Sequence, residues 1–210
     1  MKNLTLYTHP MSRGTTVLWM LKECEADHDL VLLPFGEKMK SAEYLAINPL
    51  GKVPALKHGE LVLTETLAIL TWLAEQYPEK GLIPPAASAE RGEYYRWMCF
   101  ALHLEYAAFD RFFARGDDSA EQRLAIGYGD FVTAFATLRE RLQQRDYLIG
   151  DHFTALDLYY TVLLVQFTRY RAVLPADDPV FAPYIAHHSA RPAFAETWAW
   201  AEQAAANLEP

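Results

Sequence analysis

The chain has 210 residues, which fits one large domain or two small ones and is enough to bury a core without disulfide bonds. A composition of 51% hydrophobic and 22% charged residues excludes a disordered or collagen-like chain. With 19 basic and 27 acidic side chains the formal net charge is −8, and no run of Lys or Arg is present. We therefore expect neither a nucleic-acid partner nor an anionic membrane surface.

The cysteines and the apolar segments indicate the compartment. Cys24 and Cys99 lie far apart and form no CxxC pair, so neither a zinc cage nor a dithiol redox centre is expected. The most apolar windows, 67–74 and 159–167, are much shorter than the ~18 residues of a membrane span. The sequence thus predicts a cytoplasmic protein with no bound metal and no membrane contact, and Cys24 is expected in the core.

The first eighty residues alternate strand and helix patterns. Strands are predicted over residues 3–7, 30–34, 53–57 and 61–64, and helices over 15–25, 41–47 and 65–77. The last two strands are separated by His58-Gly59-Glu60, which indicates a hairpin. This β-α-β-α-β-β-α order requires one parallel pair from the β-α-β unit, with the hairpin adding antiparallel strands at one edge.

The remainder of the chain shows only helical patterns. Residues 1–80 are predicted to form the α/β domain, and 81–88, rich in Pro, Gly and Ala, to form a linker. Helices are then predicted over residues 90–113, 120–145, 155–170 and 191–207. Residues 89–210 are accordingly predicted to be an all-helical bundle domain, in which the isolated pair His187-His188 is interpreted as part of a solvated loop.

Three segments of the α/β half can carry chemistry. Ser12 comes just before the helix 15–25, where its hydroxyl either caps the helix or donates a hydrogen bond to a bound anion. A cis Val53-Pro54 bond would turn the backbone groups of Val53 toward the open side of the sheet, where they can pair with a peptide ligand.

The third segment starts the helix 65–77. Thr64 is a candidate N-cap with Glu65 favouring the helix dipole. In the functional interpretation, the helix N-terminus and the Thr66 hydroxyl bind a carboxylate while the Glu65 carboxylate binds an ammonium. Together these groups would recognise the head group of an α-amino acid.

Taken together, these segments resemble the glutathione transferase family over essentially the whole chain. The resemblance rests on N-P-L-G-K-V-P-A-L at 48–56, on L-T-E-T-L-A-I-L at 63–70, and on G-D-H-F-T-A-L-D at 150–157. It implies a thioredoxin-like N-terminal domain, an all-helical C-terminal domain and a homodimer. The last motif is similar to the family's buried capping box, in which Thr154 caps a helix and Asp157 reaches back.

The resemblance also implies a glutathione site. Val53, with Pro54 in the cis form, would hold the cysteinyl backbone, and Glu65 and Thr66 would hold the γ-glutamyl head. Lys40, with Lys38 as an alternative, would meet the glycyl carboxylate, and Lys52 could assist there, although a solvated surface is an equal interpretation for these lysines.

The catalytic position of the family is Tyr, Ser or Cys. Here Met11-Ser12-Arg13-Gly14 is most similar to the serine-type pattern, which makes Ser12 the candidate catalytic residue. Tyr7 is the runner-up and His9 is a third possibility. The position holds no cysteine, which argues against thiol-transferase chemistry because that reaction needs a protein sulfur nucleophile.

The predicted reaction is attack of the glutathione thiolate on a small hydrophobic electrophile. The electrophile would occupy a second pocket between the domains, walled by Met11, Tyr106 and Phe109 and closed by Tyr170 and Arg171. Arg13 would either pair across the dimer interface or guard the pocket mouth. Two alternatives stay open: a non-catalytic glutathione-binding module of the same fold, and a glutathione-dependent peroxidase, isomerase or dehalogenase.

Overall fold

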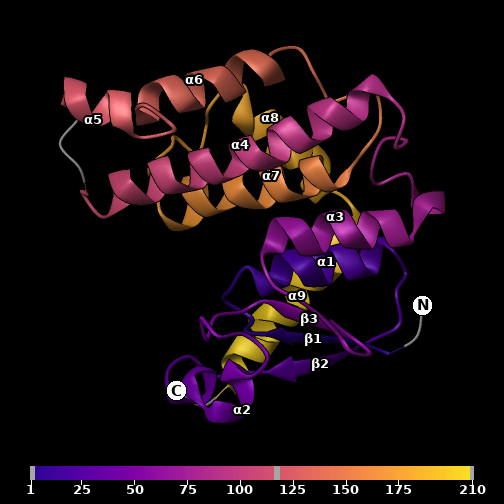
Figure 1. Cartoon of the computed structure of the whole chain (residues 1–210). Coiled ribbons are helices and arrows are strands. Elements are labelled where there is room, and N and C mark those ends of the chain that lie inside the picture. Colours follow the sequence, from indigo (N-terminus) through magenta and orange to yellow (C-terminus); the bar gives the residue numbers. More distant parts are fainter. Residues whose placement is uncertain (1–2, 116–118, 209–210) are drawn as a thin grey trace. The chain divides into compact units, whose positions relative to one another are not determined.

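The computed structural model describes residues 3–115 and 119–208 and divides the chain into two compact units (Figure 1). The first unit comprises Met1–Ile83 together with Ala190–Pro210, and the second comprises Pro84–Ser189. The break after Ile83 falls within the Pro- and Ala-rich stretch. The C-terminal segment groups with the first unit, however, whereas the sequence predicts one helical domain over all of 89–210.

The first unit is built on a four-stranded sheet with the order β2-β1-β3-β4 (Figure 1). The strands are β1 (Leu4–Thr8), β2 (His28–Leu32), β3 (Ala55–His58) and β4 (Leu61–Leu63). On β1, Leu6 lies opposite Leu30 of the parallel β2 and opposite Leu56 of the antiparallel β3. The predicted β-α-β unit and hairpin are thus confirmed. β3 begins two residues later than predicted, after Pro54, which has no N–H for the ladder.

Helices pack on the side chains that β1 buries. Leu4, Leu6 and Thr8 of β1 are buried, in the alternation of a strand with one face in the core. The helices of this unit are α1 (Gly14–Glu23), η1 (Glu37–Lys40), α2 (Ala42–Leu45), α3 (Thr66–Gln76), η2 (Pro78–Lys80) and α9 (Pro192–Asn207). Among them, α1 contacts β1, α3 and α9 and is the centre of the packing.

Aromatic packing explains why α9 belongs to the first unit. The fully buried Trp19 of α1 meets Phe194 edge-to-face at 4.9 Å between ring centroids, and Phe194 stacks on Trp198 at 4.0 Å. Arg191 donates two hydrogen bonds of 2.7 Å to the Glu23 carboxylate at the end of α1. The sequence identified this helix but gave no sign of its packing partner, and that is why the predicted domain boundary differs.

The second unit contains only helices among its described residues. They are α4 (Ala89–Phe112), α5 (Ala120–Ala125), α6 (Phe131–Leu142), α7 (Ala155–Val165), the π-helix η3 (Gln166–Tyr170) and α8 (Phe181–Ser189). α7 is buried along nearly its whole length and contacts both α4 and α8. A helix that is apolar on all sides takes this central place.

The single helix predicted over 120–145 is two helices in the structure. α5 ends at Ala125 and α6 starts at Phe131, because Gly129 takes a positive φ of 71° and Asp130 then caps α6 by accepting the N–H of Thr133 at 2.8 Å.

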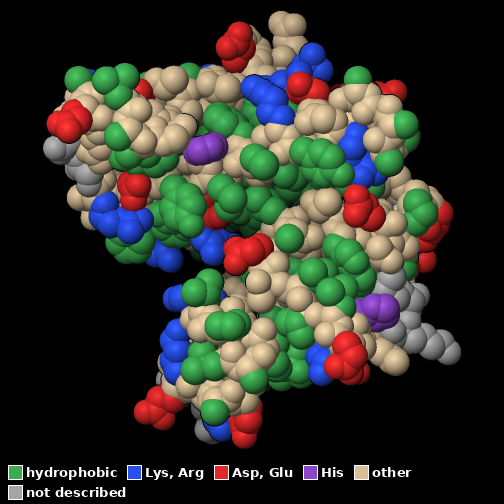
Figure 2. Space-filling model, viewed as in Figure 1, with side chains coloured by type: hydrophobic (Ala, Val, Ile, Leu, Met, Phe, Trp, Pro, Cys, Tyr) green, Lys and Arg blue, Asp and Glu red, His purple; other side chains and the backbone are tan. Residues whose placement is uncertain are grey.

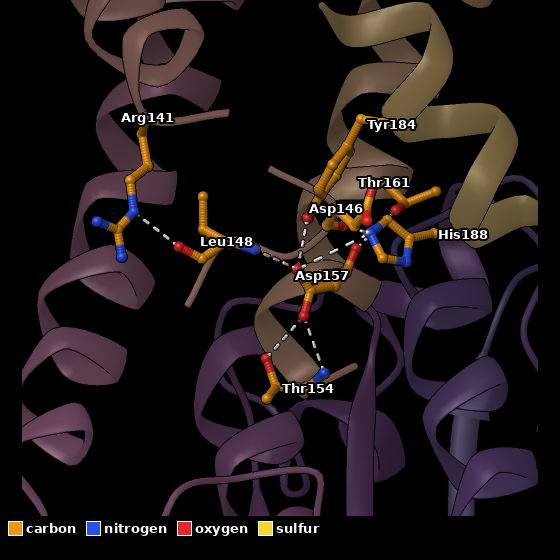
Figure 3. Close-up of polar contacts among 8 residues, drawn as sticks. All are labelled: Arg141, Asp146, Leu148, Thr154, Asp157, Thr161, Tyr184 and His188. Atoms are coloured by element: carbon orange, nitrogen blue, oxygen red, sulfur yellow. Dashed lines mark hydrogen bonds and ion pairs between the residues drawn. The ribbon is translucent and has the colours of Figure 1, made fainter. Parts of the chain in front are cut away.

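The capping box predicted at the start of α7 is present (Figure 3). Asp157 Oδ2 accepts hydrogen bonds from the backbone N–H and the hydroxyl of Thr154, at 2.9 and 3.0 Å. Its Oδ1 accepts from the Leu148 N–H and the Tyr184 hydroxyl, both at 2.7 Å. Burial raises the pKa of the Asp157 carboxyl, and these hydrogen bonds act in the opposite direction. One carboxylate therefore joins α7, α8 and the preceding loop.

The interpretation of His187-His188 as a solvated loop is wrong. Both residues lie in the last turn of α8, and His188 is buried. Its Nε2 is 2.8 Å from the carbonyl oxygen of Asp146 and 3.9 Å from Asp157 Oδ1 (Figure 3). The second histidine therefore belongs to the polar cluster around the capping box, which sequence spacing alone does not reveal.

The surface carries charges of both signs. On the face drawn in Figure 2, acidic, basic and hydrophobic side chains are intermingled. Within residues 3–115 and 119–208, no helix is both long and apolar enough to cross a membrane. The same residues hold no group of three or more His, Cys, Asp or Glu side chains placed to bind a metal ion.

Candidate active site

The candidate site begins where β1 ends and α1 starts. The carbonyl oxygen of His9 accepts the Ser12 hydroxyl at 2.7 Å and the Ser12 N–H at 3.0 Å. The Ser12 Oγ in turn accepts the N–H of Gly14, the first residue of α1, at 3.0 Å. The N-cap position belongs to Arg13, whose side chain makes no cap bond. Ser12 therefore lies one residue before the N-cap. Its hydroxyl oxygen nevertheless accepts the Gly14 N–H, which has no partner within the helix, at the positive end of α1.

Gly14 allows this turn to close against β1. A Cβ atom built on Gly14 would lie 1.8 Å from Thr8 Oγ1 and 3.1 Å from Ser12 Oγ. Any other residue type would require the Thr8 side chain to move. The Thr8 side chain therefore points toward the start of α1, on the same side as the Ser12 hydroxyl.

Tyr7 points to the opposite face of the sheet. Adjacent strand residues project to opposite sides, so Tyr7 faces away from Thr8 and from the start of α1. Its ring lies 5.8 Å from the ring of Tyr44 on α2. Of the two hydroxyls weighed from the sequence, that of Ser12 is the one beside the N-terminus of α1.

His9, the third candidate, is enclosed in the same turn. Its Nδ1 lies 3.1 Å from the backbone N of Met11, which donates to it. Its ring stacks on Phe35, in the loop after β2, with 3.6 Å between centroids and 24° between planes. Burial lowers the pKa of His9 below its ordinary value. No sequence pattern predicts the contact with Phe35.

The segment 48–54 is held by a buried asparagine and a tyrosine. The Asn48 side chain and the Tyr44 hydroxyl both donate to the carbonyl oxygen of Lys52, at 2.7 and 2.6 Å. Burial raises the pKa of Tyr44 to about 12, so this hydroxyl stays a donor. Neither residue was singled out from the sequence, because an Asn in an Asn-Pro turn gives no sign that its amide is buried.

Lys40 is part of the same loop. Its Nζ donates to the carbonyl oxygens of Leu50 and Gly51, at 2.7 and 3.3 Å. Gly51 has a φ of 57°, and a Cβ there would lie 2.4 Å from the Met39 carbonyl oxygen. Lys40 thus places its charge at the loop next to Lys52, while Lys38 lies two residues earlier in η1; both lysines are exposed.

The Val53-Pro54 peptide bond is cis, as predicted. Within the described part of the chain, the backbone of Val53 makes no hydrogen bond, and β3 begins only at Ala55. Its N–H and C=O are therefore available to a ligand next to the sheet.

The start of α3 differs from the prediction. The N-cap is Glu65, with a φ of 64° and no side-chain cap bond, so Thr64 is not the cap. The Glu65 side chain is exposed, and Thr66, which is buried, is the first helical residue. An exposed carboxylate therefore lies next to the N-terminal N–H groups of an eleven-residue helix, which attract a negative charge.

The residues predicted to line the electrophile pocket lie in both units. Met11, in the first unit, is 75% exposed; in the second, Tyr106 of α4 is 60% and Tyr170 of η3 is 63% exposed. Phe109 is half-buried, stacking on Phe113 at 6.1 Å and meeting Phe167 edge-to-face at 5.2 Å. Phe109 is thus a member of the aromatic packing of its own unit.

Cys24 lies in the core, as predicted. It is buried, and burial raises the pKa of its thiol to about 12. This cysteine cannot supply a thiolate near neutral pH.

Comparison with known proteins agrees with the fold and with the motifs. The family model described as "Glutathione S-transferase, N-terminal domain" matches residues 2–75. A glutathione S-transferase of Xanthomonas campestris is 33% identical over 66% of this chain and 75% of its own, and glutathione S-transferase 3 of Zea mays is 30% identical over 94% of each.

Solved structures give the same answer. A glutathione transferase from Methylococcus capsulatus has a TM-score of 0.79 at 28% identity, over 95% of this chain and 99% of its own. A sphingomonad glutathione S-transferase complexed with glutathione has a TM-score of 0.76 at 27% identity, over 94% and 98%. The chain belongs to the glutathione transferase family and is an enzyme of that class.

Proposed function

We propose that the enzyme binds glutathione, stabilises its thiol as the thiolate, and directs it at small hydrophobic electrophiles. The observation that carries this proposal is the Ser12 hydroxyl at the N-terminus of α1, where the helix dipole favours an anion. The ligand-facing groups of Val53 and Glu65 support it, because each supplies a contact suited to a different part of the tripeptide.

The head-group contacts follow from charge. The exposed Glu65 carboxylate pairs with the γ-glutamyl ammonium, while the Thr66 hydroxyl and the start of α3 receive its carboxylate. The backbone of Val53, beside Pro54, pairs with the cysteinyl residue as an added strand would. Lys40 and Lys52 belong to the same loop region and neutralise the glycyl carboxylate. To reach it, Lys40 gives up its hydrogen bond to a loop carbonyl oxygen.

The chemistry then needs only one hydroxyl. Ser12 rotates its O–H from the His9 carbonyl toward the sulfur and lowers the thiol pKa by a hydrogen bond to the charged form. The thiol proton leaves to solvent. The sulfur lone pair forms a C–S bond with the electrophilic carbon, and the leaving group departs with its bonding pair; in an addition, the carbanion or alkoxide takes a proton from solvent instead.

We further propose that Met11, next to Ser12 in the turn before α1, contacts the electrophile and that the enzyme is a cytoplasmic homodimer that detoxifies such compounds. Met11 is an exposed apolar side chain, which suits contact with a hydrophobic ligand. Both cysteines are free thiols, as in a reducing compartment. Light scattering tests the dimer, which requires twice the 23.9 kDa chain mass.

The test of the function has two parts. Retention on immobilised glutathione reports binding, and turnover of an aryl halide, an epoxide, an isothiocyanate and an organic hydroperoxide with glutathione reports chemistry. We expect retention together with turnover of at least one carbon electrophile. Retention without any turnover would identify a binding module, and turnover of the hydroperoxide alone would identify a peroxidase.

A further inference from the structure

In the turn between β1 and α1, His9 accepts the hydrogen bonds that Met11 and Ser12 donate. The His9 carbonyl oxygen receives the Ser12 hydroxyl and N–H, at 2.7 and 3.0 Å, and the His9 ring nitrogen Nδ1 receives the Met11 N–H at 3.1 Å. Three donors from the two residues that form the turn therefore end on His9. The ring and the carbonyl oxygen that accepts from Ser12 therefore belong to the same residue, so a change at the ring affects the position of Ser12.

The Met11 contact fixes the proton on the ring. Because Nδ1 accepts a hydrogen bond, it holds no proton, and the neutral ring carries its proton on Nε2. A doubly protonated ring would place an N–H at Nδ1 facing the Met11 N–H. The contact therefore exists only while His9 is neutral.

The surroundings favour the neutral ring. His9 is only 8% exposed, and Phe35 stacks on it while remaining 58% exposed itself. The charged residues that follow His9 and Phe35 in sequence are Arg13, on the same loop as His9, and Glu37 and Lys38, after Phe35. None of them contributes to the lowered pKa of His9, for which burial is the only cause.

We propose that His9 is a positioning residue, whose neutral ring holds the Met11 amide and thereby fixes the turn that presents Ser12 to the glutathione sulfur. This inference rests on the proposed function. It assigns His9 no contact with the sulfur, in contrast to the catalytic role considered from the sequence. It also makes the turn sensitive to acid, since protonation of the ring removes the acceptor for the Met11 N–H.

The matched variants are His9→Asn and His9→Leu. The Asn side-chain oxygen takes the place of Nδ1 as acceptor and does not titrate, whereas Leu has no acceptor. Exposed His152, on the second unit and far in sequence from this turn, provides the control His152→Asn. The thiol pKa of bound glutathione is measured by the ultraviolet absorbance of the thiolate, without any electrophile, and kcat/KM is followed from acidic to neutral pH.

We expect His9→Leu to raise the thiol pKa of bound glutathione and to lower kcat/KM about tenfold, the worth of one lost hydrogen bond in the site. His9→Asn should keep both near the wild-type values. In the wild type, log kcat/KM should steepen on its acid limb while His9 protonates and then lie about tenfold below the slope-one line extended from neutral pH, whereas His9→Asn should keep a slope of one throughout. His152→Asn should follow the wild type throughout.

Nuclear magnetic resonance of the ligand-free protein separates the inference from the function. The ¹⁵N shifts of His9 should show the Nε2–H form, and the Met11 and Ser12 amide signals should move when the ring titrates. If glutathione does not bind, the proposed function fails and this titration alone decides the inference. Amide signals that stay fixed through the titration would overturn the inference, as would equal thiol pKa values in His9→Leu and the wild type.

Discussion

The Ser12 hydroxyl lies 2.7 Å from the carbonyl oxygen of His9 and points its proton there, while its oxygen accepts the N–H of Gly14. The hydroxyl thus has two roles in the free turn, donor to the strand end and acceptor for the helix start. Donation to a thiolate requires it to exchange the first partner and keep the second. The exchange is a rotation about one bond and needs no backbone movement.

Replacement of Ser12 should test its role as a hydrogen-bond donor. Ser12→Ala removes the donor to the thiolate, so we expect kcat/KM to fall about 10²-fold and the thiol pKa of bound glutathione to rise. Ser12→Thr keeps the hydroxyl and should retain most activity. Tyr7→Phe should leave both quantities unchanged, because Tyr7 projects to the other face of the sheet; the opposite result would transfer the catalytic role to Tyr7.

Glu65→Gln should weaken glutathione binding by roughly 10- to 100-fold, because a charged partner for the ammonium becomes neutral. Isothermal titration measures the loss. A glutathione analogue without the α-amino group should bind the variant and the wild type equally. Glu60→Gln, in the exposed β3–β4 loop, is the control and should bind as the wild type does. An undiminished affinity in Glu65→Gln would remove Glu65 from the site.

Gly14→Ala should destabilise the protein by about 1–3 kcal/mol, because the new Cβ would meet Thr8 Oγ1 at 1.8 Å. Denaturant unfolding measures the effect. Thr8→Ala removes the nearer clash and should recover part of the loss. Gly92→Ala is the control, since nothing lies within 4 Å of its Cβ position on α4, and it should stabilise by about 0.5–1 kcal/mol.

Two ion pairs that join α1 to the segment 191–207 should contribute differently to the free energy of unfolding. Arg191, which is 38% exposed, makes a two-bond contact with Glu23, which is 8% exposed, whereas Lys22 and Glu196 are 28% and 63% exposed. We expect Arg191→Ala to lower the free energy of unfolding by about 1–3 kcal/mol. Lys22→Ala should change it by less than about 0.5 kcal/mol. Equal losses would contradict the argument from burial.

Cys24 should be inert in the folded protein. In a Cys99→Ser variant, a chromogenic disulfide reagent should react with Cys24 only as fast as the protein unfolds. Burial raises the pKa of Cys24 from 9.0 to about 12, so the neutral thiol is the form that the fold favours. Its contribution to stability is complete below pH 9 and is lost as the pH rises through 12. Rapid labelling in native buffer would disprove this.

Sequence patterns predicted the elements whose signals are local. The alternation in β1, the helical periodicity of α1 and α3, and the Thr154-x-x-Asp157 spacing each depend on neighbouring residues, and each is present in the structure. Residue types at the site were recognised for the same reason, since Ser12 and Val53-Pro54 stand at element boundaries that the sequence marks.

Contacts between distant segments were not predictable in this way. Phe35 stacks on His9, and His188 joins the cluster at Asp157, in pairs separated by 26 and 31 residues. No periodicity encodes such pairs, because they arise when the sheet and helices bring chain segments together. The same holds for α9, whose helical pattern is plain but whose partner, Trp19, is more than 170 residues away.

The grouping of α9 with the first unit makes that unit discontinuous in sequence. Residues 84–189 are, topologically, an insertion in a domain whose two pieces are 1–83 and 190–210. Trp19 cannot be covered until Phe194 and Trp198 have been synthesised, whereas all of the inserted unit is available earlier. During translation the first unit therefore begins before the second unit but is completed after it. A fragment ending near residue 83 would contain every proposed glutathione contact and lack part of the core that supports them.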